Sequence, residues 1–156
     1  MSSQPFSITI SAVTGDPYGL RIVEHSAWYG KALIFPRALL PKLVTSRDEF
    51  SRSAVYLLLG PSDDGDEVLY IGEADPVGER LQNHYANKDF WNRAIFFTGS
   101  NDQLNKTHVK FLEARLVQIA QSAKRIRLEN RQNPTLPSQS ESERIRSEGF
   151  LRHVLE

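Results

Sequence analysis

Two strand-forming segments at the centre of the chain flank a short segment of turn-forming residues. Residues 53–59 and 67–72 are rich in Val, Leu, Ile and Tyr, and residues 60–66 read Gly-Pro-Ser-Asp-Asp-Gly-Asp. Two such segments joined by a short polar turn predict a β-hairpin. The fold is therefore expected to contain a sheet with this hairpin in it.

Helical and strand-like segments alternate after the hairpin. Asp75 and Pro76 stand at the N-cap and first position of a helix that is expected to run to about Asn87. Residues 91–98 are rich in aromatic and β-branched side chains, which favour a strand. Residues 104–126 carry apolar side chains at helical spacing, which predicts a longer helix.

The two ends of the chain carry weaker signals. Three short strands are predicted near the N-terminus, at residues 6–10, 20–23 and 31–35. Toward the C-terminus, two prolines mark a linker, and Ser140 with Glu143 forms a capping box for a last helix. We expect residues 1–50 to form a β-rich extension that packs on a core. The core is expected at residues 51–133, and a linker with the last helix at residues 134–156. Because the helix stops abruptly at Glu156, the natural protein is expected to continue further.

Composition limits the possible functions. With 156 residues, 40% hydrophobic and 24% charged, the chain has the length and balance of one globular domain. No apolar run approaches the roughly 20 residues of a membrane helix, and the N-terminus lacks a signal peptide, so we expect no membrane partner and a cytoplasmic location. Without cysteine, a metal must be held by Asp, Glu, His or carbonyl oxygen, which favours Mg²⁺ or Mn²⁺ over structural zinc.

The basic residues gather in one stretch although the formal net charge is zero. The zero total argues against a protein that coats nucleic acid generally. Residues 101–131, however, contain seven Lys and Arg side chains against three acidic ones. This stretch is either a surface for nucleic acid or a solvated helix face.

The hairpin carries two tyrosines of matching parity. In a suitable antiparallel register, the hydroxyls of Tyr56 and Tyr70 lie on the same side of the sheet. Gly72, which has no side chain, lets a phosphate or another group approach the backbone. The alternative is that both tyrosines simply pack in the sheet, where Tyr is common.

Charged residues on the two helices extend this set. Arg80 and His84 are neighbours on one helix face, and they are suited to binding a phosphate and to carrying a proton. An ordinary surface pair is the alternative. Glu113 lies among apolar neighbours, which is costly unless it pairs or binds a cation. Its alternative is an ion pair with Lys106 or Lys110.

The order of these residues resembles the GIY-YIG nuclease superfamily. Tyr56 is followed by an intact Tyr-Ile-Gly at residues 70–72, then by Arg80, His84 and Glu113 on the expected elements. Arg80 stands ten positions beyond the second tyrosine, as in the helix of that family.

The match covers about residues 53–133 and departs from the family in its first tripeptide. Ala-Val-Tyr at residues 54–56 stands where Gly-Ile-Tyr is usual. Asn130 matches the late asparagine of the family, with Asn133 as a nearby competitor. The strands before the core resemble a bacterial subgroup that has a further C-terminal domain.

The resemblance implies an α/β (α+β) fold with a small antiparallel central sheet flanked by helices, and hydrolysis of phosphodiester bonds in DNA. Glu113 would hold one Mg²⁺ or Mn²⁺ ion that polarises the phosphate. Tyr56 would be the general base on the attacking water, helped by His84. Because an unperturbed tyrosine titrates near pH 10, this base needs cationic help from Arg80 or the metal. Arg80 would also neutralise charge on the phosphate, and Tyr70 would orient the phosphate or the water.

The same resemblance implies a surface for duplex DNA. The residues expected to contact it are Gly72, Lys106, Lys110, Lys124, Arg125 and Arg127. Two other functions stay open on the sequence. One is a nucleic-acid-binding module that keeps the fold but does not cleave, and the other is a structural domain that docks onto another protein. The target sequence and the oligomeric state are not implied.

Overall fold

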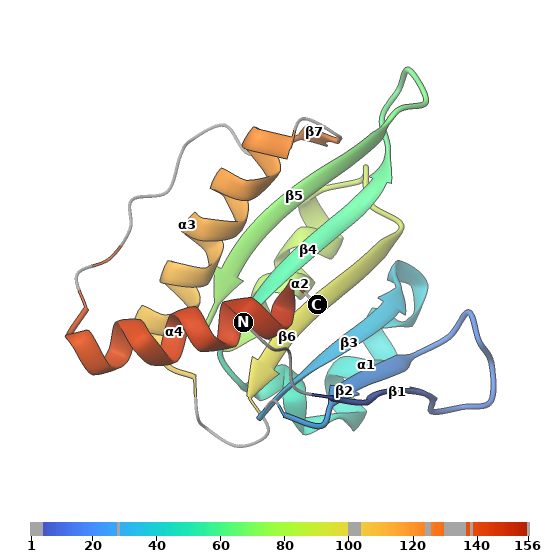
Figure 1. Cartoon of the computed structure of the whole chain (residues 1–156). Helices are drawn as coiled ribbons and strands as arrows, with labels where there is room; N and C mark the ends of the chain where they lie inside the picture. Colours follow the sequence, from blue (N-terminus) through green and yellow to red (C-terminus); the bar gives the residue numbers. More distant parts are fainter. Residues whose placement is uncertain are drawn as a thin grey trace.

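A computed structural model describes residues 5–27, 29–99, 104–123, 126–129, 137 and 139–155. In these residues, strands from both halves of the chain form one sheet, and helices cover both of its faces (Figure 1). The strand order is β1-β2-β3-β6-β4-β5-β7. The expectation of an α+β fold is therefore confirmed at this level.

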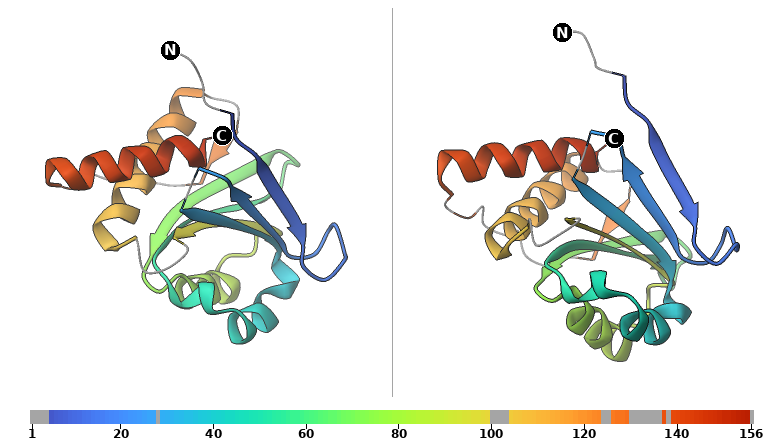
Figure 2. Two further views of the ribbon diagram at one scale, coloured as in Figure 1. Left: turned by 60° about the horizontal axis from the view of Figure 1, so that its bottom comes forward. Right: turned by 90° about the horizontal axis from the view of Figure 1, so that it is seen from below.

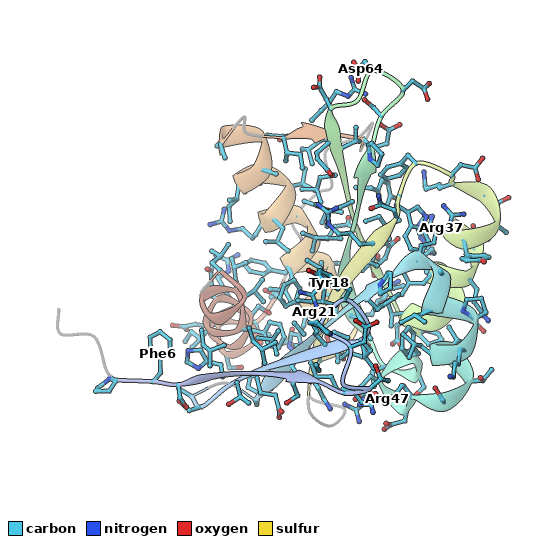
Figure 3. The ribbon with its side chains drawn as sticks, turned by 90° about the vertical axis from the view of Figure 1, so that its right-hand side faces the viewer. Phe6, Tyr18, Arg21, Arg37, Arg47 and Asp64 are labelled. Atoms are coloured by element: carbon cyan, nitrogen blue, oxygen red, sulfur yellow. The ribbon has the colours of Figure 1, made fainter. Side chains whose placement is uncertain are left out.

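The predicted hairpin is formed by β4 (Ala54–Pro61) and β5 (Glu67–Ala74). The two strands pair antiparallel along their full length, from Ala54 opposite Ala74 to Pro61 opposite Glu67. The connecting turn contains Gly65 at φ +89°, a conformation that side-chain-bearing residues rarely adopt. Asp64 lies at the tip of this turn, at the far end of the molecule from Arg47 (Figure 3).

The sheet is larger than the small antiparallel one that the resemblance implied. β1 (Ile8–Ala12), β2 (Arg21–His25) and β3 (Gly30–Pro36) form an antiparallel meander. β3 pairs along its length with β6 (Arg93–Gly99), which also pairs with β4, so the meander extends the central sheet. β7 (Arg127–Leu128) then joins β5 in parallel and makes the sheet mixed. A parallel neighbour is possible here because a long helix returns the chain to the same end of the sheet.

Helices cover both faces of the sheet (Figure 2). On one face lie α1 (Leu40–Ser46) and α2 (Val77–Asn87), with short 3-10 turns at Arg37–Leu39 and Asp48–Ser51. The other face carries α3 (Lys106–Ala123) and α4 (Glu141–Val154). None of the described helices is both long and apolar enough to cross a bilayer.

The predicted start of the last helix is partly confirmed, whereas the predicted start of α2 is wrong. Ser140 Oγ accepts a hydrogen bond of 3.2 Å from the Glu143 N–H, which confirms this part of the predicted capping box. The start of α2 differs from the prediction. The N-cap position is Pro76, with no side-chain cap, and the helix begins at Val77, so Asp75 does not cap it.

The side chains of β4 alternate between two separate hydrophobic cores, one on each face of the sheet. Tyr56 and Leu58 are fully buried against α2, whereas Val55 is fully buried against α3. Period-2 alternation in a strand covered on both faces produces this division. The expected site residues on the hairpin thus belong to the α2 side of the sheet.

A buried carboxylate ties β3 to the segment before β4. Glu49 Oε2 lies 3.0 Å from Lys31 Nζ and 2.9 Å from Arg47 Nη2. Burial raises the pKa of Glu49, but the hydrogen bonds from Arg47 and Lys31 outweigh it and lower the pKa to about 2. The carboxylate is therefore more acidic in the folded than in the unfolded chain, so its stabilising contribution is present above pH 4.5 and is lost as the pH falls towards 2.

We expect Glu49→Gln to lower the free energy of unfolding by about 2–3 kcal/mol at pH 7, because it leaves two cations beside a neutral group. The difference from wild type should shrink steadily below about pH 4. Urea denaturation at pH 7 and at pH 3 measures both values. As a control, Asp48→Asn removes an exposed carboxylate paired with Arg52 and should cost less than about 0.5 kcal/mol. Equal effects of the two substitutions would remove the special role of Glu49.

Candidate active site

The register of the hairpin brings the two expected tyrosines together. Tyr56 lies opposite Gly72, and Tyr70 lies opposite Leu58, so both tyrosine side chains project from the α2 face. Their ring centroids are 6.2 Å apart. The parity argument from the sequence is confirmed.

Gly72 is needed because the Tyr56 ring lies directly over it. A Cβ atom built at Gly72 would overlap the Tyr56 hydroxyl and ring carbons. The structure therefore gives this glycine a packing role towards Tyr56. Its expected role in phosphate approach stays a prediction.

Gly72→Ala should lower the free energy of unfolding by about 2–3 kcal/mol, since the fully buried ring cannot move aside cheaply. Chemical denaturation measures this loss. The matched control is Gly149→Ala in α4, where an added Cβ meets no atom within 4 Å. That substitution should be neutral or stabilise by about 0.5–1 kcal/mol through helix propensity. A neutral Gly72→Ala would mean that Tyr56 repacks freely.

Tyr56 is buried beneath the surface and hydrogen-bonded to His84. The side chain has 0% exposed area, and its hydroxyl lies 2.6 Å from His84 Nε2. Burial raises the pKa of Tyr56 strongly, and nearby Tyr70 and Glu113 add to this effect. Arg80 lowers the pKa but does not compensate for burial. Cationic help from Arg80 or the metal was expected, and Arg80 by itself does not bring the pKa of this hydroxyl into the neutral range.

His84 is a buried, neutral imidazole at pH 7. Burial lowers the pKa of His84 to about 4, and the charges of Lys88 and Arg80 act in the same direction. An imidazole with this pKa can accept a hydrogen bond from the Tyr56 hydroxyl, which stays protonated.

Tyr70 is the more exposed tyrosine of the pair. It is half-buried, and its ring packs edge-on against His84 at a centroid distance of 5.3 Å. Burial and the Glu113 charge raise the pKa of Tyr70, whereas Arg80 and a hydrogen bond with Tyr56 lower it. Tyr70, Tyr56 and His84 therefore form a chain of polar groups that leads from the surface to a buried imidazole.

Arg80 lies on the exposed side of this chain. Its side chain is exposed on α2, and it acts on the pKa values of four groups: Tyr56, Tyr70, His84 and Glu113. An exposed guanidinium next to buried acidic and phenolic groups is available for an anion from solvent.

Glu113 reaches the same place from α3, on the opposite face of the sheet. Burial raises the pKa of Glu113 to about 7, and the Glu73 carboxylate adds to the rise. Three groups lower that pKa without offsetting the burial: a hydrogen bond from the backbone N–H of Glu73, the charge of Lys106 and the charge of Arg80. The two faces meet at this point because β7 pairs with β5 only at Val68 and Leu69, which leaves the rest of the β5 edge open among the described residues (Figure 1).

The ion-pair alternative for Glu113 is not what the described residues show. Lys106 Nζ lies 2.9 Å from Glu73 Oε2, so this lysine pairs with Glu73. Lys110 is exposed and has no ion pair within the described part of the chain. Glu113 is thus a half-buried carboxylate held beside a second carboxylate, an arrangement that disfavours charge unless a cation is present.

These donors fit a magnesium-type ion. Mg²⁺ is commonly held by one or two carboxylates together with waters and substrate phosphate oxygens. Glu113, with Glu73 beside it, supplies this kind of donor set. Among the described residues there is no group of three or more acidic or histidine side chains that could enclose a metal ion, which argues against a fully protein-ligated site.

The expected DNA-contacting residues are only partly brought together. Lys106 lies at the start of α3, next to Glu73 and Glu113. Arg127 follows the other end of that helix, about 27 Å away along its axis, and pairs with Asp64 at 3.4 Å. Lys110 is exposed on the first turns of α3. Two further residues of the expected set, Lys124 and Arg125, lie outside the described part of the chain, as does Asn130, which was matched to the late asparagine of the family.

Two residues of the site were not expected from the sequence. Lys88 Nζ lies 4.7 Å from the Tyr70 ring centroid and contributes to the low pKa of His84. Its position four residues after His84, at the end of α2, is the signal that could have found it. Glu73 directly follows the Tyr-Ile-Gly tripeptide, and alternation along β5 puts its side chain on the face opposite the tyrosines.

Comparisons of the chain with protein-family models, with curated proteins and with solved structures gave no match.

Proposed function

We propose that this chain is a metal-dependent endonuclease of the GIY-YIG type, which hydrolyses phosphodiester bonds in DNA. The observation that carries the proposal is the state of Glu113. A carboxylate from α3 is held half-buried, with its pKa raised to about 7, within electrostatic reach of Arg80 and both tyrosines from the other face. Packing of the fold does not require a half-buried carboxylate with a raised pKa, whereas a cation-binding site needs a carboxylate ligand.

The metal, Mg²⁺ or Mn²⁺, would be held by Glu113 and would act as a Lewis acid on the scissile phosphate. Arg80 contributes an exposed, planar guanidinium that binds the phosphate and stabilises the charge that develops on it. Lys106, although paired with Glu73, is 46% exposed and can reach an adjacent phosphate of the backbone.

The buried position of Tyr56 changes its part in the proposal. A side chain without exposed area does not contact the attacking water, so the half-buried Tyr70 takes that place. The water gives a proton to the Tyr70 oxygen as Tyr70 passes its own proton to Tyr56, and Tyr56 passes its proton to His84 Nε2. The hydroxide oxygen bonds to phosphorus as the P–O bond to the leaving sugar oxygen breaks, and that oxygen takes a proton from solvent. His84 becomes an imidazolium that returns its proton to solvent through the two tyrosines after cleavage, so neither tyrosine has to persist as a phenolate. Phosphate bound beside Arg80 offsets the positive charge that disfavours protonated His84.

Nicking of supercoiled plasmid with Mg²⁺, compared with a chelator control, tests this proposal. We expect metal-dependent nicking that falls by about 10²-fold in Arg80→Ala, because the guanidinium stabilises charge in the transition state. Arg80→Lys should restore only part of the activity, since an ammonium lacks the planar fork.

The control is Arg115→Ala on α3, where the arginine donates to Gln118 at 2.9 Å on the surface. Its nicking rate should match wild type. DNA binding without nicking in any metal would favour the non-cleaving module. Full activity in Arg80→Ala would remove the assigned phosphate site.

A further inference from the structure

β1 is the outermost strand at the end of the sheet far from β5, and none of the described strands pairs with its outer edge. All five residues of β1 are exposed, and within the described residues the strand pairs only with β2. In Figures 2 and 3, β1 runs along the border of the molecule, with Phe6 near its start in Figure 3. An open strand edge is a template for pairing with another strand.

The backbone of β1 shows which residues are available for such pairing. Ser7 O accepts from Ser26 N–H at 3.0 Å, and Val13 N–H donates to Leu20 O at 3.2 Å. Odd-numbered residues thus direct their backbone groups toward β2. The N–H and C=O groups of Ile8 and Ile10 point outward, because backbone direction alternates along a strand.

The sequence of β1 is complementary to itself. Residues 7–11 read Ser-Ile-Thr-Ile-Ser, the same in both directions. Residues 5–15 contain no charged side chain, and charged side chains are the usual protection of an open edge. Ile8 and Ile10 are 45% and 64% exposed and share one face of the strand.

We propose that the edge of β1 binds a second copy of this chain, antiparallel and around a two-fold axis at Thr9. In this register Ile8 of each copy lies opposite Ile10 of the other copy, and the two residues form a hydrogen-bonded pair. The outward N–H and C=O groups are satisfied, and four isoleucines line up on one face of the joined sheet. Thr9 lies opposite the partner's Thr9 as a non-hydrogen-bonded pair.

Absence of charge favours this occupant over others. Antiparallel self-pairing places like residues opposite each other, and a charged strand would repel its own copy. Because one strand gives an interface at the small end of the known range, we expect a dimer that dissociates at micromolar concentration. This interface lies at the other end of the sheet from the proposed active site and does not depend on it.

Sedimentation velocity over a wide range of protein concentration tests the dimer. Wild type should shift from monomer to dimer, and Ile10→Lys should raise the dissociation constant by about 100-fold or more, since it replaces one isoleucine of each cross-strand pair with a charged side chain. Ile145→Lys on α4 is the matched control, because Ile145 is 66% exposed and lies on another element. Its dissociation constant should equal that of wild type. A wild-type chain that stays monomeric throughout, or an Ile10→Lys variant that dimerises normally, would overturn the proposal.

Cross-linking tests the register. The chain has no cysteine, so Thr9→Cys introduces a single thiol, and the Cα atoms of a non-hydrogen-bonded pair are about 4.5 Å apart, within disulfide range. Mild oxidation should link the Thr9→Cys variant into dimers at least about 10-fold faster than the Tyr18→Cys variant, whose position is 83% exposed at the β1–β2 turn. Equal rates would overturn the two-fold register.

Discussion

Glu113→Gln is expected to lower metal-dependent nicking by about 10³-fold or more while making the metal-free protein more stable at pH 8. The amide keeps the shape of the side chain but removes the charge that a hard cation requires. A residue that served only to stabilise the fold would show the opposite sign of stability change. The two measurements together therefore separate a functional from a structural carboxylate.

The pH dependence of this stability effect follows from the raised pKa. The pKa of folded Glu113 is about 7, above the ordinary 4.5, so the folded chain binds this proton more tightly than the unfolded chain. The free energy of unfolding therefore falls as the pH rises from about 4.5 through 7. Glu113→Gln should be more stable than wild type by about 1–3 kcal/mol at pH 8 and equal to it near pH 4.

Thermal melts with and without Mg²⁺ complete this test. A cation that binds only the folded state should raise the melting temperature of wild type but not of Glu113→Gln. Glu129→Gln, which changes an exposed carboxylate beyond β7, should leave both nicking and melting as in wild type. If Glu113→Gln nicks DNA at the wild-type rate, Glu113 does not hold the metal.

The second large effect concerns the chain from Tyr70 through Tyr56 to His84. Tyr56→Phe should lower the single-turnover cleavage rate by about 10³-fold, although the residue has no exposed area, because it interrupts proton transfer to His84. Tyr70→Phe and His84→Gln should cause similar losses. The Tyr56→Phe/Tyr70→Phe double variant should be no slower than either single variant, since both interrupt the same transfer.

DNA affinity, measured in Ca²⁺, should stay near wild type in all these variants, because proton transfer acts in the transition state. Tyr56→Phe should also cost about 1–2 kcal/mol of stability, as it leaves His84 Nε2 without its hydroxyl partner. Tyr85→Phe is the control, since Tyr85 is adjacent to His84 in α2 but packs against Arg37 on the surface. Multiplicative losses in the double variant would show that the tyrosines act independently. A wild-type cleavage rate in Tyr56→Phe would mean that Tyr70 acts without the buried Tyr56–His84 pair.

The sequence was informative where local spacing determines geometry. A short turn determines the hairpin register. In that register Tyr56 pairs across the strands with Gly72 and Tyr70 with Leu58, so both tyrosine side chains lie on the same face. The relative burial of the two tyrosines was beyond such reasoning. Tyr56 is covered because β6 pairs beside β4 and α2 packs above, and both contacts join segments distant in sequence.

Glu73 shows why the rest of the site was missed. Alternation along β5 puts this side chain on the face opposite the tyrosines, and on a wide, closed sheet that would exclude it from the site. The early end of β7 opens the β5 edge, so Glu73 and Glu113 approach groups from the other face. No single-strand pattern indicates where a neighbouring strand stops. The size of the sheet was missed for a similar reason. The described residues form a sheet of seven strands because β3 pairs with β6, and this pairing joins residues as far apart in the sequence as Gly30 and Gly99.

That pairing of β3 with β6 has a consequence for how the chain folds during synthesis. β6 lies between β3 and β4 in the sheet, yet it is made after both of them. Until residue 99 leaves the ribosome, the β1–β3 meander and the β4–β5 hairpin have no strand to join them, and each exposes an unpaired inner edge. Contacts of such long sequence separation form slowly because loop closure must precede them. The nascent chain therefore passes through an interval in which its most apolar strands are open to wrong partners, and chaperone dependence should be greatest there.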